Sequence, residues 1–254
     1  MTAVVEIHAL FWRALREIPR LPMRIVLPLL IPVVQLVLLA AVFKRLALLP
    51  GYPTSSLDFL AAGNAALAVA LGAGGAGFQM VMDIDSGFFD KLRVAPIRRA
   101  SILVGLLATD AVRLALHAMV VTLVALALGA RLATGVPGLL MLMLLGGVFG
   151  AAWSGISLNA ALRTRSFEVT AAANVVAIPF YMGSTAFMPK SLLPHWLQVA
   201  NDYNPLAYLV DAMRVLMLDG WRWTVIGEGF AAAAAVGAAT LPLALVAFRR
   251  SLRE

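Results

Sequence analysis

Three ionisable side chains fall on one face of an apolar stretch of the chain. Asp110, Arg113 and His117 stand at positions i, i+3 and i+7, a spacing that aligns side chains on a helix. Ionisable groups inside a membrane are costly and often mark a substrate pathway or a proton relay. The alternative is a structural ion pair between Asp110 and Arg113. Asn174 and Tyr181, in a later apolar stretch, are further candidates for a pathway or for hydrogen bonds between helices.

No motif for bond chemistry accompanies these residues. The three histidines are far apart, and neither H-E-x-x-H nor G-x-S-x-G occurs, so we predict no catalytic residue and no enzyme. Because cysteine is absent, a disulfide framework and a thiolate metal site are excluded, and we predict no metal.

A glycine pattern has the spacing of nucleotide-binding motifs but lacks the structural context that those motifs require. Gly72, Gly74 and Gly77 spell G-x-G-x-x-G, but no strand precedes them and they lie in an apolar run, where small residues let helices pack closely. Phe78 and Gln79 occupy the places of the Lys and the Ser or Thr that a P-loop requires. The chain therefore cannot bind ATP by that mechanism.

The composition is that of an integral membrane protein with an all-α fold. The chain is 62% hydrophobic and only 13% charged, with a mean hydropathy of +0.91. A membrane-spanning helix needs roughly 20 apolar residues, and six segments qualify. These are residues 25–43, 59–82, 102–128, 139–162, 169–187 and 224–248.

The basic residues predict the orientation of these spans. Most Lys and Arg residues cluster before the first span, between the second and third, after the fourth and after the last, as cytosolic loops do. Both termini are then cytosolic. This distribution also explains the net charge of +7 without a nucleic-acid partner. Apolar residues recur at helical spacing within residues 1–24, which predicts an amphipathic helix lying in the cytosolic interface.

A charged cytosolic loop, residues 83–101, separates the second and third spans. Residues 85–94 predict a short amphipathic helix that Asp83, Asp85 or Ser86 can cap and that Pro96 ends. Its apolar arc holds Phe88, Phe89 and Leu92, and its polar arc holds Asp90, Lys91 and Arg93. A helix held at the membrane surface between two spans gives a soluble partner a place to act.

An outer segment, residues 188–223, is too interrupted by proline to form one span. Pro194 can start a short helix, and Asn204 can cap a second one whose first residue is Pro205. Asp211 and Arg214 then stand at i and i+3. The apolar bulk of the segment predicts a hairpin of half-buried, re-entrant helices.

These motifs resemble the permease subunits of ATP-binding-cassette exporters of the type-2, daunorubicin-resistance-like class. The loop matches at Asp85, Gly87, Asp90, Lys91, Leu92, Pro96, Arg99 and Gly105. The outer segment matches through P-x-x-x-L-P-x-W-L, N-P-L-x-Y and D-A-x-R, which begin at Pro189, Asn204 and Asp211. The helix before the first span, the six spans, the loop and the outer segment also occur in the same order along the chain as in the family.

The resemblance implies a single permease domain, residues 1–254, in the cell inner (plasma) membrane. It implies two ATPase subunits that bind ATP and Mg²⁺, so the chain needs no cofactor of its own, and a second permease subunit, identical or paralogous. It implies outward movement of an amphipathic drug, lipid or glycolipid-like substrate. The ATPase-coupling residues would be Asp85, Gly87, Phe88, Phe89, Asp90, Lys91, Leu92, Arg93 and Pro96.

Two other functions stay open on the sequence. A stand-alone ion-coupled secondary transporter or channel would use Asp110 and His117 as its relay. A structural membrane subunit would anchor a partner without transporting anything. The amphipathic loop counts against the first, because a solitary carrier does not need it.

Overall fold

The described part of the chain is mostly helical and contains no strand. In this computed structural model the described residues are 12, 23–43, 56–89, 91 and 99–251. An all-α fold is therefore confirmed. The amphipathic helix predicted for residues 1–24 lies almost wholly outside the described residues, as do Asp90, Leu92, Arg93 and Pro96.

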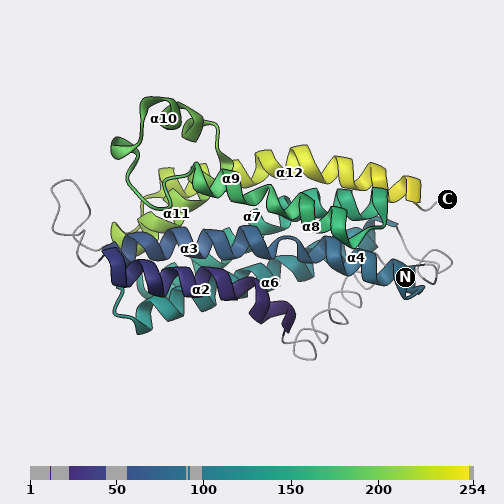
Figure 1. Ribbon diagram of the computed structural model, residues 1–254, viewed down its shortest axis with the longest axis horizontal. Helices are drawn as coiled ribbons and strands as arrows, with labels where there is room; N and C mark the ends of the chain where they lie inside the picture. Colours follow the sequence, from purple (N-terminus) through teal and green to yellow (C-terminus); the bar gives the residue numbers. More distant parts are fainter. Residues whose placement is uncertain (1–11, 13–22, 44–55, 90, 92–98, 252–254) are drawn as a thin grey trace.

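The long helices run side by side along the longest axis of the molecule (Figure 1). α7 is central, because it packs against α4, α6, α8 and α12. The helices of the bundle are α2 (Met23–Phe43), α3 (Ser56–Gly72), α4 (Gly75–Asp85), α6 (Arg99–Ala127), α7 (Gly135–Thr164), α8 (Phe167–Val175), α9 (Ala177–Met182), α11 (Pro205–Leu218) and α12 (Trp223–Ser251). We call the two ends of the bundle the Asp85 end and the α10 end, after α10 (His195–Asp202).

Four helical stretches in the described residues are long and apolar enough to cross a membrane. They are Leu57–Asp85, Ser101–Ala127, Gly135–Thr164 and Trp223–Ser251. Two shorter apolar stretches, Val26–Val42 and Phe167–Met182, correspond to the first and fifth predicted spans. All six predicted segments are thus largely helical, and four of them have the length of a full span.

The fifth segment is not one continuous helix, as the prediction had it. α8 ends at Val175 and α9 runs only from Ala177 to Met182, so residues 183–187 are not helical. Pro179 supplies the reason for the first interruption, since it has no N–H to donate to the carbonyl of Val175 four residues earlier.

The prediction of a helix over residues 85–94 is wrong at its start. Asp85 is the last residue of α4, and a turn follows in which Gly87 adopts a φ of +69°, a left-handed conformation that favours glycine. Helix resumes at Phe88. Phe89 is only 5% exposed, and its ring meets that of Phe248 edge-on at 5.8 Å. Its side chain therefore packs into the chain's own core.

At the other end of the bundle the local predictions are confirmed. α10 begins directly after Pro194, and α11 begins with Pro205 at its first position. The Asn204 side chain accepts a hydrogen bond from the Leu206 N–H at 3.0 Å, which satisfies a free donor of the first turn. α11 is mostly buried against α3, α7 and α12, whereas α10 projects from the bundle (Figure 1).

Candidate functional site

The second apolar segment is interrupted in the middle of the bundle. α3 ends at Gly72 and α4 begins at Gly75, so the helical ladder breaks at Ala73 and Gly74, which we call the α3–α4 junction. The Ala73 N–H still donates to Val69 (3.0 Å), and the Phe78 N–H donates to Gly74 (3.1 Å). A buried break frees backbone carbonyls, and these must find other donors because no water is available in a packed membrane interior.

Side chains from three other helices supply those donors. Asn174 of α8 donates to the carbonyl of Leu71 at 2.8 Å. Arg113 of α6 donates to the carbonyl of Gly72 at 2.8 Å. The Ser157 hydroxyl of α7 lies 3.0 Å from the carbonyl of Ala73. Nδ1 of His117, also on α6, lies 3.4 Å from the carbonyl of Ala68, one turn before the break.

Asp110 balances the positive charge at this point. Its carboxylate pairs with Arg113 and accepts a hydrogen bond from the Ser154 hydroxyl of α7. It also faces the backbone N–H of Ala76 in the first turn of α4, where the helix dipole favours a negative charge. Asp110 is 5% exposed. A carboxylate can remain buried here because a guanidinium, a hydroxyl and a backbone amide all face it.

The glycines around the junction allow these close approaches. A Cβ atom added at Gly74 would lie 2.8 Å from the side-chain carbon of Asn174, and one at Gly75 would overlap the Arg113 guanidinium. At Gly77 it would lie 2.7 Å from the backbone carbonyl of Ser157. The close packing that the sequence predicted for the glycine pattern is confirmed.

Four of the five predicted pathway residues meet at the junction, and the fifth does not. Asp110, Arg113, His117 and Asn174 come together there, although Asn174 is on a different helix. Tyr181 lies elsewhere, fully buried, with its ring 5.1 Å from that of Phe187. The structural alternative for Asp110 and Arg113 is supported, because the ion pair exists and both side chains make further hydrogen bonds, to Ser154 and to the carbonyl of Gly72.

Sequence reasoning missed Ser154 and Ser157, which complete the junction. They stand at i and i+3 in a mostly apolar span, between Trp153 and Leu158. That spacing places both hydroxyls on one face of a helix and was the available signal. Without the position of α4 it could not be told from hydroxyls that bond only their own helix.

A second polar cluster lies nearer the α10 end. Arg214 and Asp211 form the predicted ion pair at 2.7 Å. The Thr185 hydroxyl donates to Asp211 at 2.7 Å and accepts from Arg214 at 3.1 Å. The guanidinium of Arg214 also stacks over the ring of Phe59 on α3, 3.8 Å from its centre, as cations do on aromatic faces. The cluster ties the non-helical residues 183–187 to α11 and α3.

No group of three or more His, Asp or Glu side chains among the described residues is placed to hold a metal ion. The polar side chains at the junction bond backbone carbonyls or one another. What this arrangement can do is hold two half-helices together through bonds that can be exchanged.

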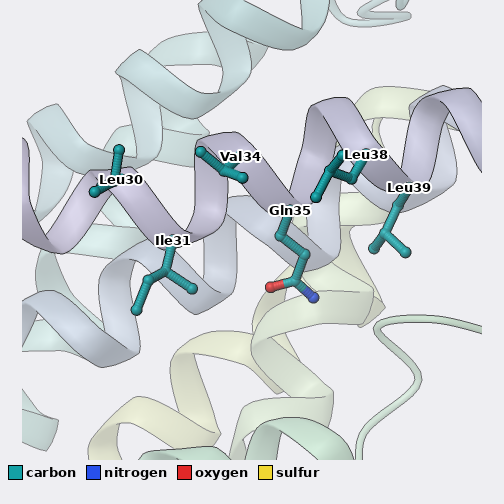
Figure 2. A pocket seen from close by; sticks show the side chains of 6 residues that line it. All are labelled: Leu30, Ile31, Val34, Gln35, Leu38 and Leu39. Carbon is teal, nitrogen blue, oxygen red and sulfur yellow. The ribbon is translucent and has the colours of Figure 1, made fainter.

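One face of α2 is apolar and open. A groove of about 480 Å³ lies along this helix. Figure 2 shows the side chains that line it, of which Gln35 is the only polar one. The lining residues are Leu30, Ile31, Val34, Gln35, Leu38 and Leu39.

Comparisons with known proteins agree with the membrane-spanning architecture. The family model described as ABC-2 type transporter matches residues 5–218. The chain is 27% identical to the daunorubicin resistance ABC transporter permease protein DrrB1 of Streptomyces coeruleorubidus, over 98% of this chain and 87% of that protein. It is 27% identical to the putative transport permease ycf38 of Porphyra purpurea, over 87% of this chain and 77% of that protein. It is also 27% identical to a probable doxorubicin resistance ABC transporter permease protein DrrC of Mycobacterium tuberculosis, over 53% and 49% of the two chains.

Proposed function

Because this chain belongs to the ABC-2 type transporter family and is a transmembrane subunit of an ABC transporter, we propose that it exports an amphipathic solute with energy from a separate ATPase. The observation that carries the proposal is the alignment with a daunorubicin resistance permease over 98% of the chain. Daunorubicin-like drugs, lipids and glycolipid-like molecules are the substrate class. The chain performs no bond chemistry, and its partner binds ATP and Mg²⁺.

The proposed assembly contains two permease subunits and two ATPase subunits in the plasma membrane. Each permease has six spans, with the amphipathic helix of residues 1–24 and both termini in the cytosol. The Asp85 end faces the cytosol, and the α10 end faces outward with α10 and α11 as a re-entrant hairpin. The burial of α11 among α3, α7 and α12 supports this hairpin. The open face of α2 is available to lipid or to the second permease.

Coupling to the ATPase is assigned to the segment that follows α4. Phe88 is half-buried and Lys91 is exposed, so both have surface that a partner can reach. Phe89 faces inward and is not assigned to the contact surface. Because its ring packs on Phe248, a displacement of this segment would be passed on to α12. Asp85, Gly87, Asp90, Leu92, Arg93 and Pro96 complete the proposed coupling set.

Purification and transport test the function. The chain alone is expected to hydrolyse no ATP, since it lacks a P-loop. Co-expressed with an ABC ATPase from the same organism, it should co-purify as a complex and drive ATP-dependent accumulation of daunorubicin in inside-out vesicles. Specific hydrolysis that stays with the lone chain would contradict the assignment. Accumulation that needs no ATPase and collapses with an uncoupler would instead establish ion-coupled transport through Asp110 and His117, which family membership does not favour.

Charge reversal at Lys91 tests the coupling segment. We expect Lys91→Glu to weaken ATPase association about tenfold, equivalent to about 1.4 kcal/mol, because it reverses an exposed charge at the proposed contact. Pull-down titration in detergent measures this. Arg222→Glu is the matched control, since Arg222 is exposed near the α10 end. Equal affinity of both variants and the parent would remove Lys91 from the contact. Phe89→Ala is unsuitable as a test, because truncating a buried Phe destabilises the chain itself.

A further inference from the structure

We propose that the α3–α4 junction is a hinge in the second span, about which α4 tilts with the coupling segment while α3 stays in place. The inference rests on the proposed function, because it needs an ATPase to displace residues 86–91. It goes beyond that function by assigning the bending point to Ala73 and Gly74 and a positioning role to the side chains that bond the junction.

The two half-helices differ in their main neighbours. α3 packs mainly against α2, α6 and α11, and its side chains from Phe59 to Ala70 are buried. α4 packs mainly against α7, and one of its residues, Met82, is 43% exposed. Both half-helices contact α6 and α7, but a load applied at Asp85 reaches a half-helix that packs neither on α2 nor on α11 to the extent that α3 does.

Two hydroxyls at the junction keep an acceptor in their own helix when α4 moves, while the carbonyl of Ala73 gives up its bond to Ser157. The Ser157 hydroxyl is 3.0 Å from the carbonyl of Ala73 and also 3.0 Å from the carbonyl of Ser154 in its own helix. The Ser154 hydroxyl lies between Asp110 and the carbonyl of Gly150, again in its own helix. Each hydroxyl has one hydrogen for two acceptors, so a move of α4 redirects that bond within α7. Unpaired buried donors are what would make such a motion expensive.

Two side-chain donors tie the end of α3. Arg113 bonds the carbonyl of Gly72, and Asn174 bonds that of Leu71, both on the α3 side of the break. On the α4 side, the Asp110 carboxylate faces the Ala76 N–H. We infer that Arg113 and Asn174 anchor the end of α3 and that Ser157 and Asp110 act as the releasable latch of α4.

The length of α4 makes the motion measurable. Its 11 residues correspond to about 16 Å of helix, so a tilt of about 15° about the junction moves its far end by about 4 Å. Gly87 then provides a second flexible point between α4 and the coupling segment.

Spin-label distances in the permease–ATPase complex test the hinge. The chain has no cysteine, so labelled pairs can be introduced without background. The pair Met82→Cys and Val104→Cys reports α4 relative to α6, and the pair Leu57→Cys and Leu128→Cys reports the start of α3 relative to the other end of α6. Met82 lies about 12 Å along α4 from the junction. On trapping with ATP and vanadate, we therefore expect the first distance to shift by about 3 Å and the second to keep its nucleotide-free distribution.

A matched pair of variants tests the latch. Ser157→Ala removes a hydroxyl that reaches the junction, whereas Thr122→Val removes a buried hydroxyl of α6 that bonds only its own helix, at the carbonyl of Ala118. Ser157→Ala should populate the shifted α4 distance before nucleotide is added, and Thr122→Val should not. Identical distributions in these two variants would remove Ser157 from the latch.

The results of these experiments distinguish a failure of the hinge proposal from a failure of the proposed transport function. If both label pairs shift together, or neither shifts while the complex hydrolyses ATP and transports drug, the hinge is overturned and the proposed function stands. If no ATPase associates with the chain, the proposed function fails and the hinge fails with it.

Discussion

Arg113→Gln is expected to destabilise the protein by about 3–5 kcal/mol, the range for leaving one charge of a buried pair uncompensated. The side chains of Arg113 and Asp110 are only 12% and 4% exposed. The substitution leaves the Asp110 carboxylate with one hydroxyl and one backbone amide, and it takes the charged donor from the carbonyl of Gly72.

A double-mutant cycle separates the ion pair from the other contacts. Adding Asp110→Asn to Arg113→Gln removes the stranded charge, so the double variant should be more stable than Arg113→Gln alone. Thermal unfolding in detergent, followed by size-exclusion fluorescence, measures the four species. Strictly additive losses would show that the two side chains do not act as a unit.

An exposed pair provides the comparison. Arg222 lies 3.3 Å from Asp219, and the two side chains are 60% and 51% exposed. Arg222→Gln is expected to cost less than about 1 kcal/mol, because water and salt screen such pairs. A loss as large as that of Arg113→Gln would mean that burial is not what makes the inner pair matter.

Gly77→Ala is expected to destabilise the protein by about 1–3 kcal/mol through overpacking. The added methyl would lie 2.7 Å from the backbone carbonyl of Ser157. Backbone atoms in a packed helix cannot rotate away as a side-chain end can, so α4 and α7 would have to separate. The same variant should lower ATP-dependent transport, since it acts beside the proposed hinge.

Gly227→Ala is the matched control in another helix. A Cβ atom added there meets nothing within 4 Å, and alanine is the better helix former by about 1 kcal/mol. This variant should be as stable as the parent or more stable. The same thermal assay compares the two, and equal melting temperatures for Gly77→Ala and the parent would show that the two helices can separate freely at this contact.

Features that depend on neighbours in the chain could be predicted from the sequence. Apolar runs gave the positions of the helices to within a few residues, except near residues 183–187 and at the break at Ala73 and Gly74 within the second span. The i, i+3 spacing placed Asp110 beside Arg113 and Asp211 beside Arg214, because one helical turn brings such residues together whatever surrounds them. The cap at Asn204 and the helix start at Pro205 are equally local, since each involves only the first turn of α11.

Features that depend on which helices touch could not be predicted. Asn174 reaches Leu71 across 103 positions of sequence, and Ser157 reaches Ala73 across 84. The apolar pattern shows that each helix has a buried face, but it does not show which other helix packs on that face. Phe89 illustrates the same limit, since amphipathic spacing cannot distinguish an apolar ring that meets a partner from one that packs on Phe248.

The break in the second span combines both kinds of cause. Gly72, Gly74 and Gly75 lower the helix propensity locally, and this is visible in the sequence. Glycines in membrane helices more often serve close packing without interrupting the helix, so they could not by themselves predict a break. The interruption is tolerated because Arg113, Ser157 and Asn174, from three other helices, hydrogen-bond the carbonyls that the break leaves without a donor in their own helix. Only the packed bundle brings those side chains to the carbonyls.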